Sequence, residues 1–366
     1  MRTHGADRIL LVTTFLLVAV GLFIVASASS GLSLKEFGTP YYFFIHQLVA
    51  GAGVGLSLLF VMRMIPFQRW KRVAPFLLIG SIFLMALLFI PGIGIAHGGA
   101  TRWVDAKFFT FQPSEILKFT FLLYLASWLA AKKKEIGTMH LGLMPFLVMM
   151  GFAGAFLVLE PDVGTLGVLS LSAAALFFLG GGRLAHLGLI IFLGLLVLGA
   201  LIYTEPYRFS RLAVFLNPSL DTQGIGYQLH QSFVAIGSGG LAGKGFGFSF
   251  QKLHLLPEPA SDSVFAIVAE ESGFVGSVIL LALFLVFFWR GIMIAQKSKD
   301  QFAKLLASGL TLLVFMQAVI NTGSLLGLLP LTGIPLPFIS YGGTSLAMHL
   351  AQVGILLNIS KHTQKL

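Results

Sequence analysis

The 366-residue chain contains no cysteine, which excludes disulfides, iron–sulfur clusters and thiolate metal sites. Charge is also scarce, because Asp, Glu, Lys and Arg make up 10% of the residues, against about 25% in a soluble domain. Hydrophobic residues account for 57%. A water-soluble fold cannot bury that much apolar surface, so the composition indicates a polytopic membrane protein.

Long apolar runs dominate what is present. A helix needs about 20 apolar residues to cross a bilayer core. The run from Ile9 to Val25 is longer than the apolar part of a signal peptide, so we expect it to be kept as the first span. The sequence thus predicts an all-α polytopic membrane protein, a single membrane domain over residues 1–366. Its ten expected spans are 9–30, 44–64, 74–94, 114–131, 142–159, 163–181, 184–203, 263–289, 305–329 and 341–359.

The basic residues alternate between the connections. Sixteen of the 24 Lys and Arg residues fall on one side of the predicted spans, and 11 of the 14 acidic residues fall on the other or within the spans next to it. The positive-inside rule then places both termini in the cytoplasm, with loops 31–43, 95–113, 204–262 and 330–340 facing outward. The net charge of +10 reflects this loop bias, and we expect no nucleic-acid partner.

The large extracytoplasmic loop 204–262, between spans seven and eight, interrupts a chain of short connections. Long loops in compact domains are usually functional or disordered, and this one has a composition that can pack. Amphipathic patterning predicts an interfacial helix over Tyr227–Ile236, ended by glycines from Gly237. The following glycine-rich stretch lacks the Walker A spacing, since Ser238 stands where glycine is required, and it reads as tight turns.

Ionisable residues inside spans are functional candidates. Glu115 and Lys118 are three residues apart in the fourth span, so they share a helix face and can pair. The pair can fix helix register or line a substrate cavity, and the sequence leaves both open. Glu270 and Glu271 lie deeper in the eighth span, where we expect a supporting role.

Asp262 ends the large loop at the mouth of the eighth span. Partial desolvation there raises a carboxyl pKa toward the range of a general base. The alternative is a plain helix N-cap, which local sequence alone favours.

Outward cations form the last group of candidates. Arginine clusters recognise phosphate oxygens, and a lipid-linked pyrophosphate is a natural ligand at an outer membrane face. The alternative is pairing with Asp105, Glu205 or Asp221. The cations are Arg102, Arg208, Arg211, Lys244 and Lys252. Before the tenth span, two prolines and two glycines between Pro335 and Gly343 predict a broken entry that lines protein or water.

Several motifs together resemble one known family, the SEDS proteins. They are Phe111-Gln112-Pro113-Ser114-Glu115 with Lys118, Glu160-Pro161-Asp162, Tyr207-Arg208 with Arg211, Gly226-Tyr227-Gln228, Gln231-Ser232, Leu256-Pro257-Glu258 with Asp262, and Gly333-Ile334-Pro335-Leu336-Pro337-Phe338-Ile339-Ser340-Tyr341-Gly342-Gly343. The resemblance covers nearly the whole chain in order. Other motifs, such as Pro91-Gly92-Ile93-Gly94, are more similar to the division-type than to the elongation-type subgroup.

The resemblance implies a peptidoglycan glycan-strand polymerase in the cytoplasmic (inner) membrane of a bacterium, with an extracytoplasmic active face. It implies lipid II and an undecaprenyl pyrophosphate-linked glycan as substrates, a class B penicillin-binding protein as partner, and the lipid bilayer as surroundings. Asp262 would be the general base. No cofactor is strictly required, although a divalent cation (Mg²⁺ or Mn²⁺) could neutralise the leaving pyrophosphate.

The charged residues of the spans and outer loops, together with the motifs of the resemblance, give the predicted substrate-binding or cavity residues: Glu115, Lys118, Arg102, Arg208, Arg211, Gln231, Ser232, Lys252, Ser261 and Ser340. One departure is Ala260, because many relatives carry His there, which puts any role of that His in doubt. The rival functions are a lipid II flippase or transporter, an elongation-type polymerase, and a scaffold that only recruits the partner. A transporter would place its charges at the midplane of broken helices, whereas here the richest polar segment is at the outer surface.

Overall fold

The computed structural model describes residues 5–97, 100–105, 110–218, 220, 222–224, 226–252 and 255–364. A helix lies on each of the ten predicted spans, and the mainly helical membrane fold is confirmed. The helices are α1 (Arg8–Ala28), α2 (Ser30–Phe37), α3 (Tyr42–His46), η1 (Gln47–Gly53), α4 (Val54–Met64), α5 (Phe67–Leu87), α6 (Pro113–Ala131), η2 (Met139–Leu143), α7 (Met144–Leu159), α8 (Val163–Leu179), α9 (Leu184–Thr204), α10 (Pro206–Leu216), α11 (Tyr227–Ser238), α12 (Val264–Lys297), α13 (Gln301–Leu325) and α14 (Gly343–Ser360).

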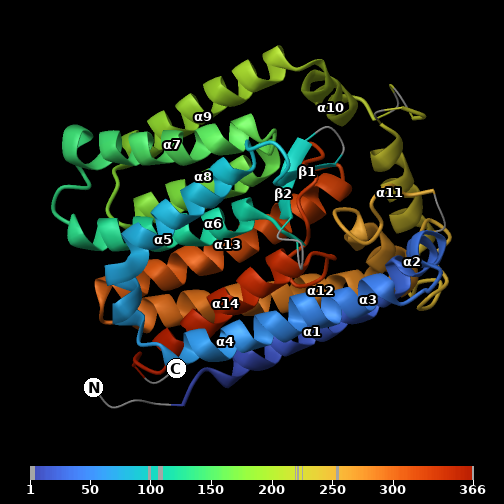
Figure 1. Ribbon diagram of the computed structural model, residues 1–366, viewed down its shortest axis with the longest axis horizontal. Helices are drawn as coiled ribbons and strands as arrows, with labels where there is room; N and C mark the ends of the chain where they lie inside the picture. Colours follow the sequence, from blue (N-terminus) through green and yellow to red (C-terminus); the bar gives the residue numbers. More distant parts are fainter. Residues whose placement is uncertain are drawn as a thin grey trace.

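Eight of these helical segments in the described chain are long and apolar enough to cross a membrane. The ten-span count is therefore not confirmed by length and hydropathy. Two of the ten predicted spans are not among these eight. They are α8, an apolar helix shorter than the other spans, and α14, whose 18 residues include His349, Gln352 and Asn358. Both lie beside the longer helices in the bundle (Figure 1).

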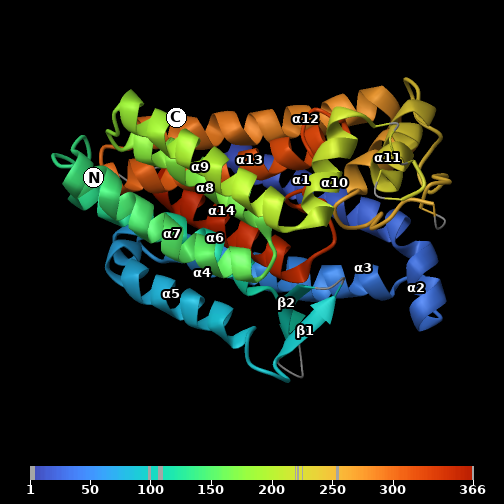
Figure 2. The same cartoon turned by 90° about the horizontal axis from the view of Figure 1, so that it is seen from above.

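The long helices run side by side, and the two ends of the bundle differ. Figures 1 and 2 show α2 and α11 at one end, while α1 begins and α14 ends at the other. The backbone N–H of Asp7 donates to Ser360 Oγ at 3.0 Å, which ties the two terminal helices together. We call the end with α11 the loop end. It carries the glycine-rich turns and the expected helix of the large loop, which the structure confirms as α11.

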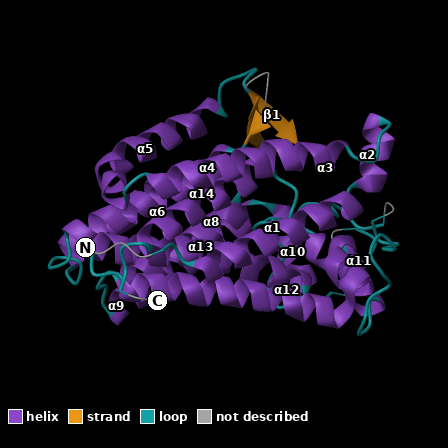
Figure 3. Cartoon of the chain, turned by 90° about the horizontal axis from the view of Figure 1, so that it is seen from below, coloured by secondary structure: helices purple, strands orange, loops and turns teal. Residues whose placement is uncertain are grey.

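The predicted loop 95–113 contains strands, which the sequence reading missed. Strands β1 (Gly94–His97), β2 (Ala100–Asp105) and β3 (Thr110–Phe111) form a small antiparallel sheet in the order β1-β2-β3. Figure 3 shows it at the edge of the helical bundle. The strands are short and their residues do not alternate clearly, so the pattern carried little signal.

The helices of the bundle differ in how much of their length is buried. In α13, 78% of the apolar window is buried inside the protein, and in α6 72%. Helix α14 is also buried along most of its length, so these three helices form the core. The one buried residue of α9 is His186, so this helix lies at the margin of the bundle (Figure 1) and leaves most of its apolar side chains at least partly exposed.

Helix α12 is broken at Gly273, where φ is 66° and ψ is −164°. A break inside a span frees backbone groups that need new partners in an apolar medium. Residues 240–245 supply them through four hydrogen bonds: Lys244 N to Glu270 O, Gly245 N to Glu271 O, Phe274 N to Gly240 O, and Val275 N to Leu241 O. The glycine-rich stretch therefore forms turns that complete a broken span.

Candidate active site

Asp262 lies in the tight turn that leads into α12. The backbone N–H groups of Ser261 and Ser263 both donate to the carbonyl of Glu258, at 3.1 and 3.2 Å, and Glu258 itself has a φ of 48°. The N-cap of α12 is Ser263. The N-cap alternative for Asp262 is therefore wrong, because its carboxylate does not cap the helix.

The carboxylate of Asp262 is half-buried and poorly compensated. Its Oδ2 accepts a hydrogen bond from Gln228 Nε2 at 3.3 Å, while its buried Oδ1 has no partner in the described part of the chain. Burial, together with the negative charge of Glu258, raises the pKa of Asp262 to about 6, against the opposing effects of Gln228 and Arg211. Such a group is ionised at neutral pH and still basic enough to accept a proton.

Hydrogen bonds from distant segments hold the backbone of this turn. Three consecutive carbonyl oxygens receive donors: Ala260 from Tyr341 N at 2.7 Å, Ser261 from Ser340 Oγ at 2.5 Å, and Asp262 from Asn321 Nδ2 at 2.8 Å. Ser340 Oγ also accepts from the N–H of Leu336 at 2.7 Å. Ser340 therefore supports the turn, and its hydroxyl is already engaged on both sides.

Glu115 and Lys118 form a buried ion pair inside the bundle. Lys118 Nζ lies 2.8 Å from Glu115 Oε1 and also 2.8 Å from Gln317 Oε1. Both side chains are almost fully buried, at 2% and 1% exposure. The structure thus supports the register-fixing interpretation of the pair.

Arg211, on α10, is the cation that acts on Asp262. Its Nη1 donates to the carbonyl of Leu331 at 3.3 Å, and its charge lowers the pKa of the carboxyl. Arg208, one turn earlier, donates to the carbonyl of Leu201 at 2.9 Å, so it closes the corner between α9 and α10. Both guanidinium groups lie 5.6 Å from the ring centre of Tyr207.

Lys252 and Arg102 are committed to structural contacts. Lys252 is buried, and its ammonium donates to Ser27 Oγ, Gly247 O and Glu271 Oε1 at 2.8, 2.7 and 3.1 Å. An ammonium group has three donors, so this set uses all of them. Arg102, on β2, donates to the carbonyl of Pro161 at 2.5 Å.

Glu270 and Glu271, for which the sequence predicted a supporting role, are also paired with lysines. Glu270 accepts from Lys244 Nζ at 2.7 Å and from the turn at Ser249, while Glu271 pairs with Lys252. The expectation that these two glutamates support the structure is consistent with these contacts. Asp221, one of the proposed partners for the outer arginines, lies outside the described residues.

Glu160 is a buried carboxyl that the sequence analysis quoted within a motif but did not predict as a site residue. It lies between α7 and α8, and neither carboxyl oxygen has a partner in the described residues. Burial, followed by the nearby Asp162, raises the pKa of Glu160 to about 9, although Arg102 opposes the shift. Glu160 is therefore protonated at neutral pH.

The α11 residues divide between the site and local structure. Gln228 donates to both Asp262 Oδ2 and Ser263 Oγ, the latter at 2.9 Å. Ser232 is buried and its hydroxyl donates to the Gln228 carbonyl at 2.8 Å, and half-buried Gln231 lies beside them on α11. Gln228, Asn321 and Gln317 are the polar residues that the sequence reading missed as site candidates. Gln228 belonged to one of the motifs of the resemblance. For Gln317 and Asn321, the available signal was the presence of two amide side chains within an apolar span.

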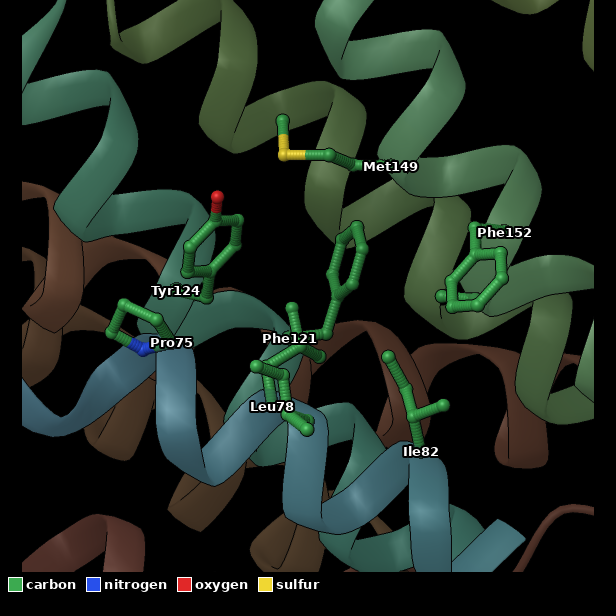
Figure 4. A pocket seen from close by; sticks show the side chains of 9 residues that line it. Pro75, Leu78, Ile82, Phe121, Tyr124, Met149 and Phe152 are labelled. Atoms are coloured by element: carbon green, nitrogen blue, oxygen red, sulfur yellow. The ribbon is translucent and has the colours of Figure 1, made fainter. Parts of the chain in front are cut away.

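A cavity of about 190 Å³ lies between α5, α6 and α7, away from the Asp262 turn. Figure 4 shows Phe121 between side chains of the neighbouring helices, with Pro75 and Leu78 on one side and Met149 on the other. Its lining is apolar apart from the Tyr124 hydroxyl, so it suits a hydrocarbon chain and offers nothing to bind phosphate.

Fold and site together define a polytopic helical membrane protein that keeps an incompletely paired carboxylate at one end of its bundle. A family model described as "Cell cycle protein", covering FtsW, RodA and SpoVE, matches residues 7–365. The chain belongs to this family, as its motifs indicated.

Curated relatives match over almost the full length. The chain is 38% identical over 361 residues to "Stage V sporulation protein E" of Bacillus subtilis, covering 98% of each protein. It is 39% identical over 363 residues to "Probable peptidoglycan glycosyltransferase FtsW" of Coxiella burnetii, covering 98% of this chain and 97% of the relative.

Solved structures agree in fold. A chain in the study "Structural coordination of polymerization and crosslinking by a peptidoglycan synthase complex" superposes with a TM-score of 0.80 at 27% identity, over 97% of both chains. The crystal structure of the rod shape determining protein RodA from Thermus thermophilus gives 0.71 at 28% identity, over 98% of both.

Proposed function

We propose that this chain is a peptidoglycan glycosyltransferase that polymerises glycan strands from lipid II during cell division, with Asp262 as general base. The names of its relatives support the reaction and the division role. The observation that carries the residue assignment is the Asp262 carboxylate itself, which has one oxygen without a partner among the described residues and a pKa raised to about 6. General bases work best when their pKa lies near the operating pH.

In the proposed reaction, Asp262 accepts the proton of the acceptor sugar 4-hydroxyl of lipid II. The oxygen attacks the anomeric carbon of the lipid-linked strand, and the bond to undecaprenyl pyrophosphate breaks with inversion from α to β. Pyrophosphate is a good leaving group, so no general acid is needed. One carboxylate is then sufficient, unlike the pair used by most glycosidases.

The negative charge that develops on the leaving pyrophosphate needs cations nearby. Arg211 is the best placed, because its charge acts on Asp262 and its guanidinium offers further donors beyond the bond to Leu331. Arg208 shares its helix. We assign no such role to Lys252, since its donors are used on Ser27, Gly247 and Glu271.

The described residues form no cage that would hold a divalent cation without substrate. Within the described residues, no group of three or more His, Asp or Glu side chains is arranged to hold a metal ion. Mg²⁺ sites usually combine one or two carboxylates with substrate phosphates. Asp262 and the neighbouring Glu258 would therefore be the protein ligands of a cation that arrived with the substrate, where it would offset the charge of the pyrophosphate. No step of the mechanism is assigned to a metal.

We further propose that the loop end faces the extracytoplasmic side of a bacterial inner membrane, with both termini cytoplasmic. The distribution of basic residues supports this orientation. A class B penicillin-binding protein is the proposed partner, since a structural neighbour was studied in a complex that joins polymerization to crosslinking.

The test is strand synthesis from lipid II by the purified protein, with and without its crosslinking partner. We expect Asp262→Ala to abolish polymer while the melting temperature of the protein does not fall. The matched control is Glu36→Ala, which removes an exposed carboxylate on α2 and should keep wild-type yield. Wild-type polymer from Asp262→Ala would overturn the assignment.

The alternative functions predict different results for the same protein. A flippase would move fluorescent lipid II across vesicles without making polymer, and a scaffold would tolerate Asp262→Asn in cells. An elongation-type enzyme would rescue loss of rod shape and fail to rescue loss of division. Burial of the Glu115–Lys118 pair against Gln317 speaks against the transporter, because these charges neutralise each other.

A further inference from the structure

Two amide side chains on one face of α13 connect the interior of the bundle to the Asp262 turn. Gln317 and Asn321 are four residues apart, so they lie one above the other, and both are buried. Gln317 accepts from Lys118 Nζ at 2.8 Å and donates to the carbonyl of Pro335 at 2.9 Å. Asn321 donates to the carbonyls of Ile334 and Asp262, at 2.7 and 2.8 Å.

These contacts have a fixed direction. A lysine ammonium can only donate, so it holds the Gln317 oxygen and leaves the Gln317 amide nitrogen to face Pro335. The Asn321 nitrogen likewise faces two carbonyls. Consecutive carbonyls at Ile334 and Pro335 lie in a stretch without helical hydrogen bonds, and they must find donors inside the protein.

The same non-helical stretch holds the Asp262 turn from its other end. Ser340 and Tyr341 donate to the carbonyls of Ser261 and Ala260, while Asn321 donates to Asp262. The side chain of Asp262, in contrast, has the long bond to Gln228 as its hydrogen bond. The place of the carboxylate is thus set mainly through its backbone.

We propose that Gln317 and Asn321 are positioning residues that link the Glu115–Lys118 pair to Asp262, so that the ion pair acts on the reaction without touching substrate. This inference rests on the proposed function and deepens it. Lys118 orients Gln317, Gln317 and Asn321 fix residues 334 and 335, and Asn321 with this stretch fixes the turn that carries the base. A displacement of about 1 Å at a reacting group can lower a rate about 100-fold.

The first test uses Asn321→Leu, which keeps the approximate volume and removes both donors. We expect kcat for strand synthesis to fall about 10- to 100-fold, while KM for lipid II stays within about threefold. The control is Thr322→Val on the same helix, because the Thr322 hydroxyl donates only within α13, to the carbonyls of Ala318 and Val319. A wild-type kcat for Asn321→Leu would overturn the inference.

The second test separates positioning from simple stability. Gln317→Glu keeps an acceptor for Lys118 and has no donor for Pro335 when ionised. Combined with Glu115→Gln, it keeps the charge balance around Lys118. We expect the double variant to melt above Gln317→Glu alone, because Lys118 again has a single negative partner, while its kcat stays about 10-fold or more below wild type. Recovery of both quantities would show that the amides serve stability alone, which contradicts the proposal.

The third test asks whether the ion pair and the amide lie on one path. Contacting residues on a shared path give non-additive effects. The kcat of Lys118→Met combined with Gln317→Leu should be no lower than that of the more impaired single variant, within about threefold. Losses that multiply would mean that Lys118 acts independently, and would overturn the linkage.

These outcomes are distinguishable from failure of the proposed function. Polymer made at the wild-type rate by Asp262→Ala removes the proposed function and this inference together. An inactive Asp262→Ala beside a fully active Asn321→Leu removes only the positioning role.

Discussion

The rate of strand synthesis should fall at acidic pH as Asp262 takes up a proton. Burial and the charge of Glu258 raise the pKa of this carboxyl from 3.8 to about 6. The ionised fraction of the general base is then about one tenth at pH 5, about half at pH 6 and about nine tenths at pH 7. We therefore expect an acid limb centred near pH 6, with roughly a tenfold loss of rate between pH 7 and pH 5.

Three neighbours should move this limb in directions that the structure specifies. Glu258→Gln removes a negative charge that raises the pKa of Asp262, so the limb should shift to lower pH. Arg211→Gln and Gln228→Leu remove groups that lower the pKa, so both should shift it to higher pH. Arg211→Gln should also lower the plateau rate, because the leaving pyrophosphate loses a cation.

The assay is the initial rate of lipid II polymerisation at saturating substrate from pH 5 to pH 8, with thermal melting recorded at each pH. Melting separates loss of the base from loss of the fold. A flat wild-type profile across pH 5–7 would refute the reasoning. So would a shift of Glu258→Gln and Arg211→Gln in the same direction.

The same pKa has an opposite consequence for stability. A carboxyl whose pKa is raised on folding loses stability as pH rises from 3.8 through 6, because the folded state binds the proton more tightly. At pH 7 the ionised Asp262 would destabilise the fold by at most roughly 3 kcal/mol. Asp262→Asn should thus raise the melting temperature at pH 7 while polymer synthesis stops, and a lowered melting temperature would contradict the assigned pKa.

Three further predictions concern residues away from the base. Glu160→Gln should raise the melting temperature at pH 7 and flatten its decline between pH 5 and 9. The reason is that folding raises the pKa of Glu160 to about 9, which destabilises the folded state by roughly 3 kcal/mol at pH 7. An unchanged pH profile of melting would contradict this prediction. Lys252→Met should destabilise the fold by about 3–5 kcal/mol, because it leaves Glu271 unpaired. The double variant Lys252→Met with Glu271→Gln should recover both the melting temperature and the activity. A stable but inactive double variant would instead give Lys252 a role in the reaction. Gly21→Ala should destabilise by about 1–3 kcal/mol, since a Cβ there would overlap the Phe338 carbonyl oxygen, and melting curves would measure it against Gly5→Ala, where the space is open.

Spans were predictable because apolar runs of bilayer length leave few alternatives. Their ends were less so: the third span was expected from residue 74, yet α5 begins at Phe67. The basic stretch at its start suggested a loop, but buried Phe67 and Trp70 hold that first turn against the protein. Tertiary packing, which periodicity does not encode, decided the boundary.

Residues of the candidate site were partly predictable. Asp262 was singled out by its place at the end of a long polar loop. Its partner Gln228 is 34 residues away and the Asn321 that holds its carbonyl is 59 away, and no helical or strand period relates such separations. Lys252 is a residue whose contacts the sequence did not reveal. As a basic residue in an outer loop it suggested phosphate binding, whereas in the folded chain it points inward and pairs with Glu271.

The buried and half-buried acidic side chains of the described residues differ in how they are compensated, and the contrast points to the reactive one. Glu160 has no hydrogen-bond partner among these residues, but its pKa of about 9 leaves it uncharged at neutral pH, and Asp162 caps the N-terminus of α8. Asp7, Glu115, Glu270 and Glu271 each have a cationic side chain bonded to the carboxylate. Asp262 has instead a hydrogen bond from a neutral amide on one oxygen and, among the described residues, no partner on the other, while the neighbouring cation Arg211 acts from a distance. Asp262 therefore carries a charge at neutral pH without a bonded cation, and such departures from local rules occur mainly where function requires them. Because Asn321, Ser340 and Tyr341 secure the backbone of the turn, the carboxylate can stay unpaired and still be held in place. That combination of a rigid backbone and a free oxygen is what a proton acceptor needs.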